Sequence, residues 1–65
     1  MLYVNGEPCD IKTPVTVLAL LQSRNLAPER VAVERNGDII RRACFSDTLL
    51  NDRDRIEIVH FVGGG

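Results

Sequence analysis

Short stretches in which apolar and polar residues alternate recur along the chain, and this period of two is typical of half-buried strands. We expect strands at residues 2–4, 7–12, 31–35, 38–41 and 55–62. In the first of these, Leu2 and Val4 share one face and Tyr3 lies on the other. The last stretch is apolar on both faces, which indicates a strand in the middle of a sheet.

Two Asn-Gly pairs separate neighbouring strands, and each predicts a tight hairpin. Asn5-Gly6 follows the first strand and Asn36-Gly37 follows the third. Both residue types accept the positive φ angles that two-residue hairpin turns need. Pro8 in the second strand lacks an N–H, so we expect that strand at an edge of the sheet.

Between the two hairpins the pattern changes to the period of a helix. Residues 17–24 place Val17, Leu20 and Leu21 on one face. Thr16 is suited to the N-cap and Asn25 to the position after the C-cap. A helix of two to three turns is stable only when it packs against something else.

Residues 43–50 predict an irregular crossing with one short helical turn, in which Phe45 and Leu49 reach the core. Residues 51–54 are polar and predict a tight turn. The order is hairpin, helix, hairpin, crossing and strand. It predicts an α+β fold with a mixed sheet of four to five strands and one main helix across one face, the last strand lying beside and parallel to the first.

Length and charge limit the classes of function. The 65 residues form one domain, too small to enclose a deep catalytic cleft by itself. A net charge of −1 argues against non-specific nucleic-acid binding. No apolar run is long enough to cross a membrane, and no signal peptide is visible. We therefore expect a cytoplasmic protein with neither nucleic acid nor membrane as partner.

Cys9 and Cys44 are the candidates for thiol chemistry. They fit no metal-binding or redox spacing, so we expect two free thiols, buried or half-buried, in a reducing compartment. A structural disulfide and a catalytic pair of a cysteine with His60 remain alternatives. His60 otherwise has the inward parity of its strand and a structural place near the end of that strand. We expect no metal site and no catalytic residue.

The three glycines at residues 63–65 suggest chemistry at the C-terminal carboxylate. Glycine can pass through a narrow channel, and the four residues from Val62 to Gly65 extend about 13 Å. The carboxylate is anionic near neutral pH and must be activated before a nucleophile can attack it. Activation by ATP requires Mg²⁺ and fixed cations, which a separate enzyme must supply. A frayed terminus or a cloning remnant is the alternative.

A docking surface is predicted next to these glycines. Tyr3, Val59 and Phe61 should point to the outer face, and neighbouring strands would join them into one apolar patch beside the tail, together with Val62. Sheet packing without a partner is the alternative. Arg41-Arg42 and the acidic residues of the second half form either a solvated surface or a charged rim that steers a partner.

Several sequence segments in this order resemble the ThiS family of ubiquitin-like β-grasp sulfur carriers. They are Tyr3-Val4-Asn5-Gly6, Thr16-Val17 with Leu20-Leu21, Val31-Ala32-Val33-Glu34 with Asn36-Gly37, Ile56-Glu57-Ile58-Val59, and Phe61-Val62-Gly63-Gly64-Gly65. Two departures are visible: Arg53 stands where the family often has Gly, and the proline that the family often has near Arg41 is absent. Both concern turns more than chemistry.

The resemblance implies a β-grasp domain at residues 1–62 and a flexible tail at residues 63–65. It implies that Gly65 is adenylated by an E1-like adenylyltransferase of the ThiF type, which uses ATP and Mg²⁺, while Gly63 and Gly64 thread its active site. Sulfur from a donor such as a cysteine desulfurase relay then gives a thiocarboxylate. A thiazole synthase of the ThiG type consumes this sulfur in thiamin biosynthesis, so the chain is a co-substrate and not an enzyme, and it binds no cofactor.

Three other functions share parts of this pattern. The small subunit of molybdopterin synthase has the same implied fold and glycine end, but is usually longer. A ubiquitin-like modifier would transfer the same acyl group to a lysine amine. A plain interaction domain would carry an inert tail.

Overall fold

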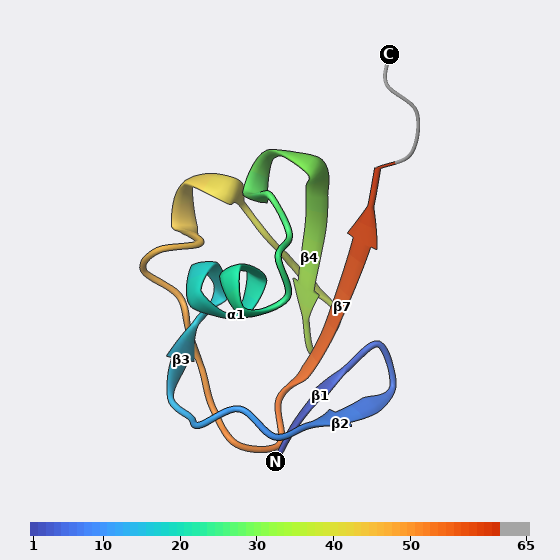
Figure 1. Cartoon of the computed structure of the whole chain (residues 1–65), viewed down its shortest axis with the longest axis vertical. Coiled ribbons are helices and arrows are strands. Elements are labelled where there is room, and N and C mark those ends of the chain that lie inside the picture. Colours follow the sequence, from blue (N-terminus) through green and yellow to red (C-terminus); the bar gives the residue numbers. More distant parts are fainter. Residues whose placement is uncertain (62–65) are drawn as a thin grey trace.

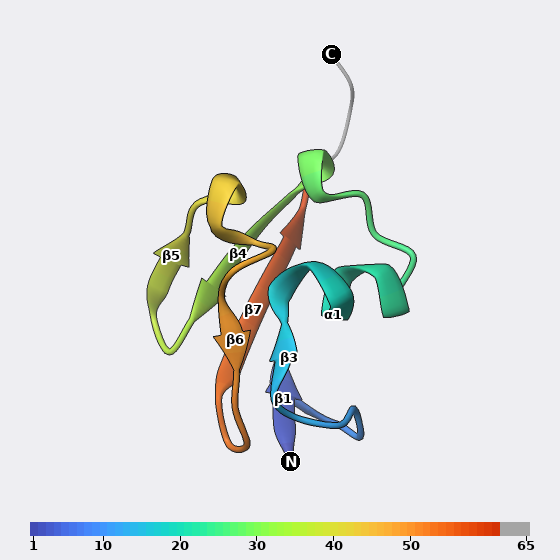
Figure 2. The same cartoon turned by 90° about the vertical axis from the view of Figure 1, so that its left-hand side faces the viewer.

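The computed structural model describes residues 1–61, and the predictions for Val62, Gly63, Gly64 and Gly65 lie outside this part of the chain. One helix lies across one face of a five-stranded sheet (Figures 1 and 2). The elements in chain order are β1 (Leu2–Val4), β2 (Glu7–Cys9), β3 (Val15–Thr16), α1 (Val17–Ser23), the 3₁₀ turn η1 (Pro28–Arg30), β4 (Val31–Arg35), β5 (Asp38–Ile40), the 3₁₀ turn η2 (Arg42–Cys44), β6 (Leu49–Leu50) and β7 (Arg55–His60).

The main sheet has the order β2-β1-β7-β4-β5. β7 is central and runs parallel to β1, while the other neighbours are antiparallel. The predictions of a mixed sheet, of a central last strand and of its parallel pairing with the first strand are confirmed. β2 is an edge strand, as Pro8 predicted, although it ends at Cys9 and not at Lys12.

Both predicted hairpin turns are present. The φ angles are 51° and 81° at Asn5 and Gly6, and 51° and 90° at Asn36 and Gly37. Positive φ at both central residues gives the turn a twist that matches the flanking strands. These turns fix the register of β1 with β2 and of β4 with β5.

The helix begins as its sequence predicts. The Thr16 hydroxyl accepts a hydrogen bond from the Ala19 N–H at 3.0 Å, which satisfies one of the free donors of the first turn. Asn25 follows the helix with a φ of 58°. Val17, Leu20 and Leu21 are buried, and they pack in one core with residues from β1, β4, β6 and β7.

One part of the core prediction was wrong. Phe45 is buried, but Leu49 is 50% exposed and Leu50 takes the core position. A small second sheet explains the difference, because β6 pairs antiparallel with β3 and places Leu50 opposite Val15. Alternate residues of a strand point to opposite faces, so Leu49 is directed outward.

Candidate functional site

The candidate site lies where β7 reaches the end of the described chain, at residues 59–61, which we call the exit segment. The Phe61 N–H donates a hydrogen bond to the Arg30 carbonyl at 2.8 Å, so the ladder with the β4 side continues to the last described residue. Val59 is 58% exposed and Phe61 is 56% exposed. The exit segment therefore carries two exposed apolar side chains, one in the last part of β7 and one directly after it.

The main sheet has one face covered by α1 and one open face. Paired residues share a face, so the register places Tyr3, Arg55, Glu57 and Val59 together on the open side. Exposure of 39% at Tyr3 agrees with its predicted outward direction. The predicted outward directions of Val59 and Phe61 agree as well.

The prediction that Tyr3 joins Val59 and Phe61 in one apolar patch was wrong. Tyr3 pairs with Arg55, at the start of β7. Val59 is four residues further along, about 13 Å at the usual rise of a strand. Arg55 and Glu57 lie on the open face between Tyr3 and Val59, so the exposed apolar surface at the exit segment consists of Val59 and Phe61 without Tyr3.

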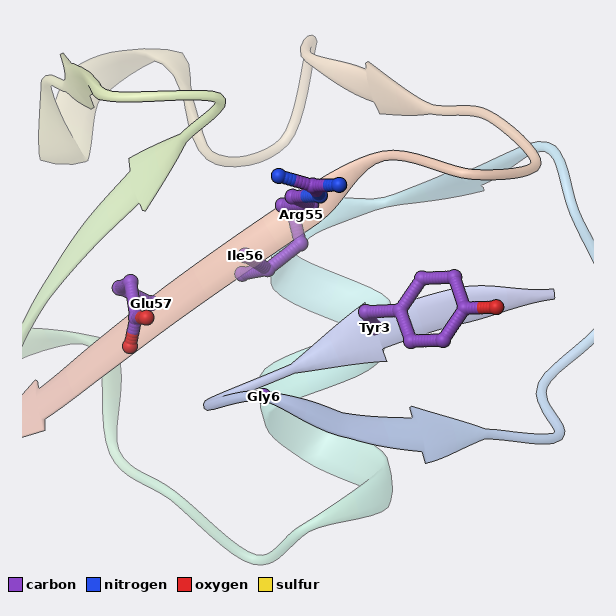
Figure 3. A pocket seen from close by; sticks show the side chains of 5 residues that line it. All are labelled: Tyr3, Gly6, Arg55, Ile56 and Glu57. Atoms are coloured by element: carbon purple, nitrogen blue, oxygen red, sulfur yellow. The ribbon is translucent and has the colours of Figure 1, made fainter.

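Tyr3 instead borders a depression on the open face. Its other lining residues are Gly6, Arg55, Ile56 and Glu57 (Figure 3). A second depression shares Arg55 and Glu57 and is completed by Glu34, Asn36 and Gly37. Glu57 belongs to the acidic residues predicted to form a solvated surface or a charged rim, and it lies on the open face together with Val59, as its parity predicts. Arg55 was not among the predicted site residues, although its odd parity in the last strand, shared with Glu57 and Val59, was the signal that could have placed it on this face.

The two cysteines form neither a disulfide with each other nor a pair with His60. Both cysteines are free, and Cys44 is exposed, contrary to the expectation of burial. Cys9 is half-buried, and the Arg24 Nη1 lies 4.0 Å from its sulfur. His60 is exposed at the end of β7. Within residues 1–61 no hydrogen bond joins either thiol to His60, and no group of three His, Cys, Asp or Glu side chains could hold a metal ion.

Across the described part of the chain, no helix has the length and apolar character needed to span a membrane.

The fold and the position of the exit segment define a class of protein. A mixed five-stranded sheet grasping one helix, with the chain leaving from the central strand, is a ubiquitin-like β-grasp domain. The chain belongs to the ThiS family, whose model matches residues 2–65.

Individual relatives agree with this membership. The chain is 47% identical over 66 residues to the sulfur carrier protein ThiS of Bacillus subtilis, and the match covers all of both proteins. It is similar to a crystal structure of the thiamine biosynthesis protein (ThiS) from Geobacter metallireducens, with a TM-score of 0.82 and 37% identity over 98% of this chain and 97% of that one.

A different kind of relative is much longer. The thiazole synthase of Magnetococcus marinus is 42% identical over 64 residues, which are 98% of this chain and 20% of that protein. The chain therefore spans about a fifth of the length of this relative.

Proposed function

We propose that the chain is a sulfur carrier of thiamin biosynthesis and that Gly65 bears the transferable sulfur. The observation that carries this proposal is the family match, which extends to residue 65 and so includes the three glycines. The name of the Bacillus subtilis relative, which matches over its whole length, supports it.

The proposed chemistry takes place at the carboxylate of Gly65. A carboxylate oxygen of Gly65 attacks the α-phosphorus of ATP, and pyrophosphate leaves. The outer sulfur of a persulfide, supplied by a donor such as a cysteine desulfurase relay, then attacks the acyl carbon, and AMP leaves. A thiol reductant cleaves the S–S bond of the resulting acyl disulfide, which releases the donor thiol and leaves the thiocarboxylate on Gly65. The adenylyltransferase provides the Mg²⁺ and fixed cations that phosphoryl chemistry needs. The chain itself is consumed as a co-substrate and contributes the acyl group and its recognition.

Thiazole synthase is the proposed sulfur acceptor. In the Magnetococcus marinus protein, a segment similar to this chain is part of a polypeptide named thiazole synthase. This shared polypeptide supports a thiazole synthase as the acceptor of the sulfur that this chain carries.

Intact-mass spectrometry tests the function directly. We expect incubation with ATP, the E1-like enzyme and a sulfur donor to raise the mass by the difference between one sulfur and one oxygen. Deletion of Gly65 should abolish the modification and leave the melting temperature unchanged, because the core lies within residues 2–56. An unmodified wild-type chain in the presence of an active enzyme would contradict the proposal.

The exit segment gives a second test. We expect Phe61→Ala to weaken binding to the adenylyltransferase about tenfold, as for an apolar side chain at the centre of an interface. The fold should persist, because the bond to Arg30 comes from the Phe61 main chain. Ile39→Ala is the matched control, since Ile39 is 75% exposed and lies on the edge strand β5. Equal affinities of the two variants by calorimetry would exclude Phe61 from the interface.

A further inference from the structure

The last part of β7 has one side without a neighbouring strand. β1 pairs with β7 only at Tyr3–Arg55 and Val4–Ile56, and then turns away at Asn5. Beyond this hairpin, no ribbon of residues 1–61 lies beside β7 on the β1 side (Figure 1). The strand is thus central at its start and an edge at its end.

The hydrogen bonds show which residues face this edge. Phe61 donates to Arg30, and the Arg55 carbonyl accepts from the Asn36 N–H at 2.8 Å, so odd-numbered residues of β7 direct their main chain toward β4. The Ile56 carbonyl accepts from the Asn5 N–H at 2.8 Å, on the opposite side. Main-chain direction alternates along a strand, so Ile58 and His60 also face the β1 side.

Both main-chain groups of Ile58 form hydrogen bonds with a side chain. Its N–H donates to the Asn5 Oδ1 at 2.7 Å, and its carbonyl accepts from the Asn5 Nδ2 at 3.2 Å. The Asn5 amide thus takes the place of one further strand residue. At His60 the ladder stops, and within residues 1–61 neither its N–H nor its carbonyl has a hydrogen-bond partner.

We propose that the main chain of His60 receives an extended segment of the enzyme that binds the tail, which adds a strand to β7 at the exit segment. This inference rests on the proposed function, because it needs an enzyme that takes up residues 63–65. An exposed strand edge is a template for pairing, and an added strand draws affinity from main-chain bonds and specificity from alternate side chains. Val59 and Phe61, both exposed and on either side of His60, supply those side chains.

A second copy of this chain fits the edge less well. Within the described residues, the Asn5-Gly6 hairpin leaves only the main chain of His60 free on this edge. Two copies of the chain could therefore pair there through a single residue from each copy. Such a contact is far below the roughly 1,200 Å² of a stable interface. An enzyme that takes up residues 63–65 can add contacts with Val59 and Phe61 to this pairing.

Amide hydrogen exchange by NMR tests the edge in the free chain first. We expect the His60 amide to exchange quickly, and the amides of Val59 and Phe61, which face β4, to exchange slowly. Ile39 provides an internal reference, because alternation along β5 directs its N–H to the outer edge of that strand. A slowly exchanging His60 amide in the free chain would overturn the inference, as would protection caused by dimer formation at high concentration.

The complex with the adenylyltransferase and ATP is the second stage. We expect His60 to become protected and Ile39 to stay unprotected. A chemically synthesised chain with an ester in place of the His60 amide should bind roughly fivefold more weakly, the effect of one lost main-chain hydrogen bond. The same ester at Ile39 is the matched control.

The outcomes separate this inference from the proposed function. A complex that forms while His60 remains unprotected, or an ester at His60 without effect on affinity, overturns the added strand alone. Failure of the wild-type chain to bind the enzyme at all overturns the proposed function and this inference with it.

Discussion

At the scale of single residues, Arg53 adopts a backbone conformation that suits glycine. Its φ is 74°, in the turn before β7. The turn is held by other groups: the Arg53 N–H donates to the Met1 carbonyl at 2.9 Å, and the Asp54 carboxylate accepts from the Asn51 N–H at 2.8 Å. The surroundings therefore impose the left-handed conformation on a residue whose Cβ disfavours it.

We expect Arg53→Gly to raise the free energy of unfolding by about 1 kcal/mol, because glycine adopts this φ without the steric cost of a Cβ. Urea denaturation measures the change. Arg53→Ala is the control: it also removes the exposed 3.9 Å contact with Asp52, but keeps the Cβ. A gain as large in the alanine variant would show that charge, and not backbone strain, is responsible.

At the scale of elements, both Asn-Gly hairpins have a second role: the asparagine side chain of each forms hydrogen bonds with the main chain of β7. Asn5 bonds to Ile58, and the Asn36 Oδ1 accepts from the Arg55 N–H at 2.9 Å while its Nδ2 donates to Asp54 at 3.1 Å. The central strand is thus held by a side-chain amide from each neighbouring hairpin. Turn propensity alone would favour asparagine here, and the hydrogen bonds add a reason to prefer it to glycine.

We expect Asn5→Gly to lower the free energy of unfolding by about 1–2 kcal/mol, since glycine keeps the turn but loses two hydrogen bonds to a strand. The exchange of the Ile58 amide should become faster, while that of Phe61, on the other side of β7, should not. If the Ile58 amide stays protected from exchange in the variant, the side-chain hydrogen bonds of Asn5 do not stabilise β7.

Most helices, strands and turns of this fold could be predicted from the sequence. Each element with its own local signal was found: the hairpins through Asn-Gly, the helix through Thr16 and its apolar face, and the central strand through its two apolar faces. β3 and β6 were missed because two-residue strands have no period to recognise, and the core position was assigned to Leu49 for the same reason. The placement of Tyr3 failed because strand register is a long-range property that composition does not encode.

At the scale of the whole molecule, three arginines lie at the end of the sheet that holds the exit segment, and the adjoining segments also carry the acidic residues Glu29 and Asp47. Arg30 precedes β4, and Arg41 and Arg42 follow β5, at the end of the sheet where Val31 pairs with His60. All three arginines are exposed. Both ion pairs within residues 1–61 have Asp52 as the acid, so neither involves these arginines. In a chain of net charge −1, this end is suited to an acidic surface on the partner.

We expect Arg41→Glu with Arg42→Glu to lower the association rate with the adenylyltransferase about tenfold at low salt, and much less at high salt, where screening removes the steering. Stopped-flow measurements at several salt concentrations give the rates. The control reverses the same number of charges elsewhere, with Lys12→Glu in the connection from β2 to β3 and Arg53→Glu beside Met1. Equal slowing by both pairs would indicate net charge rather than a local surface.

The N-terminus is anchored far from the exit segment. The Met1 amino group forms an ion pair with Asp52, and its carbonyl accepts from Arg53, next to the start of β7 and not its end. A linker attached at Met1 gives up one exposed contact, of little energetic weight. Chains tethered to a biosensor surface through this amine would all present residue 61 to the solution, so binding partners could be measured on an oriented layer without obstruction by the attachment.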